Sequence, residues 1–319
     1  MTRQSHLLNV TVDACQLRGS VLCFDLKAPD GADLPEWEAG AHIDLHLEDG
    51  LIRQYSLCGN PADRKRYSLA VLLDPKSRGG SVAVHRLVCN GAQFQISQPR
   101  NLFPLARDAQ SSLLIGGGIG VTPMIAMAYE LHDKAENFAL HYVARDPVFT
   151  PVLQALPFAE HVVIHDHSQA ERPRFNVQNT LAKWIEQSGS GVHVYVCGPE
   201  GLMQAVAQAG SACDLPEGHV HQEAFSAQTV EGGSGFEVLG AKSGVRVQVA
   251  EDETIAAAFA RSGVRVPVSC EQGICGTCVV SVLEGKPEHR DEYLTDEEKT
   301  DQIALCCSRS KTPLLVVDL

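Results

Sequence analysis

The cysteines near the carboxyl end of the chain have a spacing that suits an iron–sulfur cluster. Cys270, Cys275 and Cys278 follow the pattern C-x4-C-x2-C, and Cys306 and Cys307 come later. Four thiolates hold a [2Fe–2S] cluster, and this spacing is typical of the plant type. A structural zinc site, the alternative, usually takes two C-x2–4-C pairs and fits three cysteines in one loop poorly. Because adjacent residues of a strand point to opposite faces, only one of the last two can complete the set.

A glycine-rich segment, residues 116–123, has the composition of a dinucleotide-binding loop. Glycine lets the backbone approach a pyrophosphate, and the amino end of a following helix favours its charge. Pro123 stands where G-x-G-x-x-G would have its last glycine, so an ordinary tight turn is the alternative. The segment Cys197-Gly198-Pro199 supports nucleotide binding, since open α/β sheets bind ligands at the carboxyl ends of their strands. Cys197 is either a thiol that only packs or a neighbour of the nicotinamide.

A cation and an aromatic ring on one strand are suited to a phosphorylated aromatic cofactor. Arg53 and Tyr55 share one face of a predicted strand, whereas Ser56 points to the other face. The segment Arg78-Gly79-Gly80-Ser81 then opens a short helix, whose amino end is a further place for phosphate. An exposed strand pair without a ligand is the alternative interpretation.

The chemistry of the two ends of the chain favours a flavin between them. A nicotinamide gives up two electrons as a hydride, whereas a [2Fe–2S] cluster accepts one electron at a time. Flavin is the usual cofactor that divides the pair. The nucleotide itself is left open, because Asp146 would suit a ribose hydroxyl and Arg145 a 2′-phosphate.

Three modules must position these residues. Short strands with many turn signals in residues 1–106 predict an antiparallel β-barrel. Alternating strands and helices in residues 107–227 predict an α/β domain, a parallel sheet with helices on both faces. The polar stretch 226–235 is rich in Gly and Ser and predicts a linker, after which residues 235–319 form an α+β module with the cysteine loop. Strands are expected at 41–57 (a hairpin turning at Asp49-Gly50), 67–73, 112–115, 139–143, 161–165, 192–197 and 220–223, and helices from 123 and at 177–186, 199–209 and 254–261.

Charge and composition argue against several classes of partner. The net charge of −13 repels phosphate and argues against nucleic acid. The odd count of 11 cysteines speaks against a disulfide framework. No apolar run approaches the ~20 residues of a membrane span, and the first residues do not read as a signal peptide. We therefore expect a cytosolic protein with no membrane partner.

In their order along the chain, these motifs resemble the phthalate dioxygenase reductase family, which includes the reductases of vanillate demethylase and carnitine monooxygenase. The resemblance covers essentially the whole sequence. It implies an FMN-binding β-barrel, a ferredoxin-reductase-type nucleotide-binding domain and a carboxyl-terminal β-grasp ferredoxin domain. Within this family a carboxyl-terminal ferredoxin domain goes with FMN and an amino-terminal one with FAD.

The resemblance also implies roles for individual residues. Arg53, Gly80 and Ser81 would bind the FMN phosphate, and Tyr55 would pack on the isoalloxazine. Ser56 would hydrogen-bond near the reactive nitrogen, Cys197 would lie near the nicotinamide carbon, and Phe225 would cover the flavin before hydride transfer. The dinucleotide would contact Gly116, Gly118, Thr122, Gly198 and Pro199. The Cys-x-Ser-Arg ending of the family makes Cys306 the fourth cluster ligand beside Cys270, Cys275 and Cys278.

The activity that the resemblance implies is that of an NADH-dependent reductase for a multicomponent, Rieske-type oxygenase or demethylase, as found in the degradation of aromatic compounds. The chain has no Cys-x-His pair of the Rieske type, so the oxygenase is expected to be a separate protein. A cytochrome P450 or another acceptor is an alternative partner. A redox carrier or sensor without turnover is an alternative of another class, against which the intact segments 53–56 and 116–123 argue.

Overall fold

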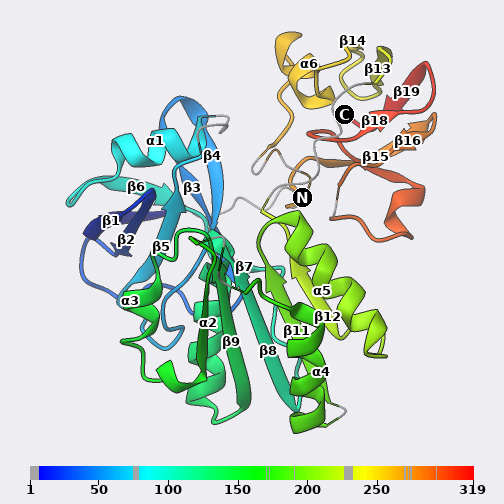
Figure 1. Cartoon of the computed structure of the whole chain (residues 1–319). Helices are drawn as coiled ribbons and strands as arrows, with labels where there is room; N and C mark the ends of the chain where they lie inside the picture. The colour runs from blue at the N-terminus through cyan, green and yellow to red at the C-terminus, as the bar shows by residue number, and fades with distance from the viewer. Residues whose placement is uncertain are drawn as a thin grey trace. The chain divides into compact units, whose positions relative to one another are not determined.

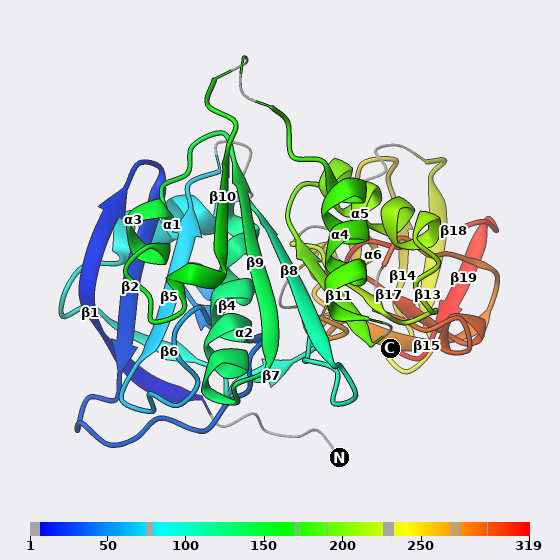
Figure 2. The same ribbon diagram turned by 60° about the horizontal axis from the view of Figure 1, so that its bottom comes forward.

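The computed structural model divides into two compact units, Met1–Glu223 and Ala224–Leu319, and each is described by itself (Figures 1 and 2). It describes residues 7–74, 79–169, 171, 173–189, 191–225, 233–268, 271, 273, 275–291 and 293–319. The predicted linker therefore lies largely outside the described residues. The division into three domains at 106/107 and 227/235 stays a prediction.

The amino-terminal part of the first unit is an antiparallel β-barrel. Its strands are β1 (Leu8–Arg18), β2 (Val21–Lys27), β3 (Ala41–His46), β4 (Ile52–Ser56), β5 (Tyr67–Leu72), β6 (Gln93–Ile96) and β7 (Arg100–Asn101). They follow the order β4-β3-β6-β1-β2-β5, with β7 paired to β3. The outer strands β4 and β5 contact each other, which closes the sheet. The helix α1 (Gly80–Leu87) follows β5.

The predicted hairpin is present as the antiparallel pair β3–β4. Its turn is the short 3-10 helix Glu48–Gly50, and Gly50 has a positive φ of 74°, which glycine adopts without a steric penalty. The hairpin matters for function because it carries Arg53, Tyr55 and Ser56 on its second strand.

The second part of the first unit is a parallel sheet in the order β10-β9-β8-β11-β12. Its strands are β8 (Ser111–Gly117), β9 (Asn137–Ala144), β10 (Val162–Asp166), β11 (Val192–Cys197) and β12 (Val220–Glu223), and its helices are α2 (Val121–Asp133), α3 (Thr150–Leu153), α4 (Val177–Ser188) and α5 (Glu200–Ala212). Leu113, Val194 and Val196 share one core with α4 and α5. Buried residues of α2 are absent from that core although α2 contacts β8 and β9, so α2 covers the other face.

The helix expected from Pro123 begins at Val121, directly after the 3-10 turn η2 (Gly118–Gly120). Pro123 lies in its first turn, where a missing N–H leaves no hydrogen bond unmade. The other strands and helices named from the sequence are present; the strands at 192–197 and 220–223 have the predicted ends, and the ends of the rest differ by at most three residues. No helix in the described part of the chain is both long and apolar enough to cross a membrane.

The second unit is a mixed sheet with one helix packed on it. Its strands are β13 (Phe236–Gly240), β14 (Arg246–Val249), β15 (Val279–Glu284), β17 (Gln302–Ala304) and β19 (Leu314–Val317), a separate pair is β16 (Pro287–Glu288) with β18 (Arg309–Ser310), and the helix is α6 (Ile255–Arg261). The helix begins where the Thr254 hydroxyl accepts a hydrogen bond from the Ala257 N–H at 3.1 Å, a normal N-cap. The parallel pair β13–β19 sits between antiparallel neighbours, as in a β-grasp fold.

Candidate functional site

Two features predicted to bind phosphate, which are separate in the sequence, meet at the edge of the barrel. Arg53 lies on β4, and α1 begins after Gly79, which has a φ of 88°. A Cβ placed on Gly80 would lie 2.6 Å from Cγ of Arg53, so the arginine side chain lies directly on the first turn of the helix. A guanidinium beside the amino end of a helix is a good site for a phosphate. Arg78 lies outside the described residues.

The neighbouring side chains complete this edge. The Ser81 hydroxyl accepts a hydrogen bond from the Asp74 N–H at 3.1 Å, which fixes the start of α1 against the end of β5. Burial raises the pKa of Tyr55 to about 12, although Arg53 opposes the shift. Tyr55 is therefore a neutral phenol whose ring can pack on a planar cofactor.

The two predicted nucleotide loops interlock at the carboxyl edge of the parallel sheet. A Cβ on Gly120 would lie 2.3 Å from the carbonyl oxygen of Cys197, and a Cβ on Gly117 would lie 2.7 Å from Cδ of Pro199. Gly198 has a φ of 154° and lies against the backbone of Gly117. Only glycine fits such contacts, and the resulting flat backbone surface admits a pyrophosphate.

The structure also brings together Gly116, Gly118 and Thr122 in this loop. A Cβ on Gly116 would meet Val121 at 2.6 Å, whereas Gly118 has a φ of 57° and open space beside it. The Thr122 side chain is buried, and its hydroxyl donates to the Ile119 carbonyl at 3.0 Å. Thr122 thus holds the turn, and its contact with the nucleotide stays a prediction.

A serine, a cysteine and a glutamate lie where the barrel meets the parallel sheet. Ser56 is buried, and its hydroxyl donates to Oε2 of Glu223 at 3.5 Å. Glu223 is opposite Cys197 in the parallel pairing of β12 with β11. The flavin-type strand and the nucleotide-type loops therefore meet at one place, as a hydride-transfer site requires. Phe225 follows β12 at the start of the second unit, and its role stays a prediction.

The surroundings of Glu223 and Cys197 favour the protonated forms of the carboxyl and the thiol. Burial raises the pKa of the Glu223 carboxyl to about 8, and the hydrogen bond from Ser56 opposes the shift. Burial and the neighbouring Glu223 raise the pKa of the Cys197 thiol well above its usual range. At neutral pH the site therefore holds a carboxylic acid and a thiol, so Cys197 is a small neutral wall and not a nucleophile.

Glu223 is the site residue that sequence reasoning missed. Its only signal in the sequence is its place as the last residue of a strand beside the one that ends in Cys197. Residues at the carboxyl ends of adjacent parallel strands meet at one edge of the sheet, and this rule applied to residues 220–223 would have found it.

The raised pKa of Glu223 predicts a pH-dependent stability that Glu223→Gln removes. The folded protein binds this proton more tightly than the unfolded chain, so the stabilisation is complete below pH 4.5 and is lost as the pH rises toward 8. At about 1.4 kcal/mol per pKa unit, the free energy of unfolding of the wild type should fall by roughly 5 kcal/mol more than that of the variant. Urea unfolding at several pH values measures this, and Trp fluorescence reports on the first unit because both tryptophans, Trp37 and Trp184, lie there. Parallel curves for the two proteins would contradict the prediction.

The cysteine loop has the backbone of a cluster-binding loop. Glu271, Gly273 and Gly276 have φ values of 53°, 75° and 70°, and such left-handed residues turn successive N–H groups toward the inside of a loop. The Cys275 thiol lies 3.2 Å from the Thr277 hydroxyl. Amide and hydroxyl groups of this kind donate hydrogen bonds to the sulfur atoms of a cluster.

The pairing of β15 with β17 brings two of the predicted ligands together. Cys278 precedes β15 and Cys306 follows β17, and the Leu305 N–H donates to the Cys278 carbonyl at 3.2 Å. Both cysteines are buried, whereas Cys307 is half-buried. Cys270 lies outside the described residues, and among those described no three His, Cys, Asp or Glu side chains form a metal-holding group. The four-thiolate set therefore stays a prediction, and the donor types and the loop backbone fit it.

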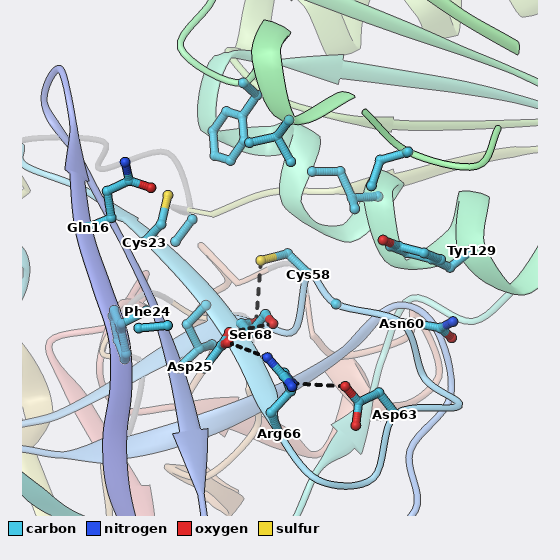
Figure 3. A pocket seen from close by; sticks show the side chains of 18 of the residues that line it. Gln16, Cys23, Phe24, Asp25, Cys58, Asn60, Asp63, Arg66, Ser68 and Tyr129 are labelled. Atoms are coloured by element: carbon cyan, nitrogen blue, oxygen red, sulfur yellow. Dashed lines mark hydrogen bonds and ion pairs between the residues drawn. The ribbon is translucent and has the colours of Figure 1, made fainter. Parts of the chain in front are cut away.

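Two cavities lie away from these residues. One of about 360 Å³ separates β2 and β5 from α2 and α3, and Arg66 in its wall pairs with Asp25 at 3.3 Å and Asp63 at 2.9 Å (Figure 3). Another of about 560 Å³ lies beside β6 and the 3-10 turn at Glu48. Neither is lined by a predicted site residue, so shape alone would have misplaced the site.

Comparison with known proteins identifies a nucleotide-binding part and an iron–sulfur part of this chain. Residues 239–311 match the 2Fe-2S iron-sulfur cluster binding domain, and residues 114–208 match the oxidoreductase NAD-binding domain. The vanillate O-demethylase oxidoreductase of Pseudomonas sp. (strain HR199 / DSM 7063) is 43% identical over 98% of this chain and 100% of its own. The solved structure of phthalate dioxygenase reductase is 35% identical, covers 99% of both chains and has a TM-score of 0.79. The chain belongs to the phthalate dioxygenase reductase family.

Membership of the phthalate dioxygenase reductase family confirms the predicted fold class and makes the protein an electron-transfer oxidoreductase. The predicted cofactor set of NADH, FMN and a [2Fe–2S] cluster is the set of this family. A second solved structure, an intact type IV self-sufficient cytochrome P450 monooxygenase, is 34% identical over 98% of this chain and 41% of its own, with a TM-score of 0.77.

Proposed function

We propose that this chain is the NADH-dependent reductase component of a multicomponent, Rieske-type oxygenase or demethylase. Electrons would pass from NADH through FMN and the [2Fe–2S] cluster to a separate oxygenase protein. The observation that carries this proposal is the meeting of Ser56, Cys197 and Glu223 between the barrel and the nucleotide loops, on the same chain as an iron–sulfur domain. The likeness to the vanillate demethylase component supports the kind of partner.

The residues of the chain would bind the flavin and the nucleotide, orient them and shield them from water. Arg53 and the amino end of α1 would hold the phosphate of FMN, and Tyr55 would pack on its ring. FMN, when bound, supplies the conversion of a hydride into single electrons. Ser56 would donate a hydrogen bond at the ring, and Glu223 holds a proton beside it at neutral pH.

The nucleotide loops would place the nicotinamide against this edge. Gly116, Gly118 and Gly198 would admit the pyrophosphate, and Cys197 would border the nicotinamide as a neutral thiol. Asp146, two residues beyond β9, would accept the ribose hydroxyls of NADH. The cluster would be held by Cys270, Cys275, Cys278 and Cys306, and Phe225 would cover the flavin.

A cytochrome P450 is a second candidate acceptor. The observation that favours it is the self-sufficient P450 monooxygenase, 41% of whose chain matches almost the whole of this one. The cytosolic location also stays a prediction.

An anaerobic titration of the purified protein with NADH tests the proposed function. We expect stepwise bleaching of the flavin and cluster absorption bands, and release of FMN when the protein is denatured. The NADH-reduced protein should then pass electrons to a purified Rieske-type oxygenase and not to a P450. Bleaching without FMN, or transfer to the P450 alone, would contradict the proposal at the corresponding step, and no flavin bleaching at all would leave a carrier or sensor.

A further inference from the structure

Polar rings occupy successive positions on one face of β11 and β12, behind Glu223. The parallel register sets His221 beside Tyr195 and Glu223 beside Cys197. The valines that alternate with them pack in the core under α4 and α5, so these four side chains face the other way. His193, two residues before Tyr195, faces the same way.

Two of the histidines are joined directly. Nδ1 of His193 lies 2.9 Å from Nε2 of His221, so one nitrogen donates and the other accepts. The His221 ring is stacked on Tyr195, with centroids 4.5 Å apart and planes 9° from parallel. The Tyr195 hydroxyl is itself fixed, because it accepts a hydrogen bond from the Ala106 N–H at 2.7 Å. The imidazole pair is therefore aligned along the row.

The outer end of this pair points toward the carboxylate of Asp108. The His193 side chain is 5% exposed, and its Nε2 is buried without a hydrogen-bond partner in the described part of the chain. That nitrogen lies 3.8 Å from Oδ1 of Asp108, whose side chain is 83% exposed. A small rotation of the exposed carboxylate brings the two atoms within hydrogen-bonding distance.

The inner end points toward the Ser56–Glu223 contact. Glu223 and His221 lie on the same face of β12, two residues and therefore about 6.6 Å apart along the strand. The path inferred below takes one water molecule between these two side chains, because a bridging water is nearly as favourable as a direct hydrogen bond. The row thus leads from the half-buried carboxyl group of Glu223 toward Asp108, whose side chain is exposed.

The proposed function requires such a connection, and the inference rests on it. A hydride consists of two electrons and one proton. When the two electrons leave singly for the cluster, the proton stays behind and must leave the site once per NADH. We propose that Glu223, His221, His193 and Asp108 form the path by which this proton reaches water.

Each transfer on the path is balanced. The O–H bond of Glu223 breaks, and an N–H bond forms at Nδ1 of His221 through the bridging water. The N–H at Nε2 of His221 breaks as one forms at Nδ1 of His193, and the N–H at Nε2 of His193 passes its proton to Asp108 or water. The proton that the hydride leaves behind then re-forms the O–H bond of Glu223, and reorientation of both rings between turnovers restores their first tautomers.

The protonation states at neutral pH suit a relay of this kind. Burial lowers the pKa of His221 to about 4 and also lowers that of His193, so both rings are neutral and can accept on one nitrogen while donating from the other. The other titratable groups that face the row are His219, which stacks on His193 at 4.0 Å, and Asp108, Tyr195 and Cys197, with Glu136 at longer range.

A single-turnover experiment on the holoenzyme tests the path. One equivalent of NADH is mixed with the protein and ferricyanide in weak buffer with a pH indicator dye, so that flavin bleaching and proton release are followed separately. The variants are His221→Gln and His193→Gln. The matched control is His141→Gln, because His141 Nδ1 and His165 Nε2 form the same 2.9 Å contact on β9 and β10, away from Glu223.

We expect both relay variants to release the proton roughly 100-fold more slowly, the lower end of what a positioned proton-transfer group contributes. Flavin bleaching by NADH should change little, the His141 control should behave as wild type, and added imidazole should restore proton release. Proton release at the wild-type rate in both relay variants would overturn the proposal. An equal loss in all three variants without rescue would also overturn it, because the effect would then be structural.

A second readout does not depend on turnover. In protein with 15N-labelled histidines, NMR should show His193 and His221 as neutral rings near pH 7 that share one N–H···N hydrogen bond. Charged rings or no shared hydrogen bond would overturn the path. If NADH failed to bleach the flavin of the wild type, the proposed function would be wrong, and the NMR result would still decide whether the pair can relay a proton.

Discussion

Cys306→Ser will leave the purified protein without its iron–sulfur cluster, and Cys307→Ser will not. The two residues are adjacent, but Cys306 is buried next to the pairing that holds Cys278, whereas Cys307 is half-buried. Sγ of Cys307 packs against the loop, 2.6 Å from where a Cβ of Gly273 would lie. Four thiolates are needed to hold the cluster, so loss of the right one removes it entirely.

Iron and inorganic sulfide analysis of both variants measures the outcome. We expect near-zero content in Cys306→Ser and wild-type content in Cys307→Ser. NADH should still bleach the flavin in both, because that site lies in the first unit. The reverse pattern, with the cluster lost only in Cys307→Ser, would show that the assignment taken from the family resemblance is wrong.

Gly120→Ala will disable the nucleotide site. The added Cβ would lie 2.3 Å from the Cys197 carbonyl oxygen and 2.5 Å from its carbon, and backbone atoms cannot rotate away as a side chain can. The turn η2 and the end of β11 must therefore separate. Overpacking of this kind costs about 1–3 kcal/mol of stability, and a displacement near 1 Å at a reacting centre lowers the rate roughly 100-fold.

Stopped-flow bleaching with NADH and urea unfolding measure the two effects of Gly120→Ala. Gly201→Ala is the matched control, because Gly201 lies in the first turn of α5 with open space around its Cα. Alanine at a helical position without a clash keeps or slightly raises stability. Equal rates for the two variants would show that the contact between the loops does not position the nucleotide.

The sequence predicts the strands, helices and turns of this protein better than it predicts the contacts between them. The hairpin at 41–57 and the glycine turn at 116–120 have local causes, namely alternating apolar residues and glycines, and both are present. The contact between Arg53 and Gly80 depends on closure of the barrel. No local sequence pattern predicts such a contact. Only the resemblance to a family indicated that Arg53 and Gly80 act at one site.

Glu223 is a site residue that no local sequence pattern predicts. A glutamate at the end of a short strand is ordinary in sequence, and its raised pKa arises only because pairing of β12 with β11 buries it beside Cys197 and under Ser56. His193 and His221 likewise lie 28 residues apart in the chain and meet only in the sheet. The Thr122 hydroxyl bonds to the turn itself, which the sequence pattern does not predict, and its contact with the nucleotide stays a prediction.

The two compact units of this protein are parts of one polypeptide, and this affects how its electron transfer responds to dilution. Two modules joined in one chain meet at an effective concentration that the covalent link sets, whatever the amount of protein in solution. Transfer from the flavin to the cluster is therefore a first-order process that dilution leaves unchanged. The handover to a separate acceptor is second-order, so at low protein concentration the search for that acceptor, and not the chemistry within the reductase, sets the rate.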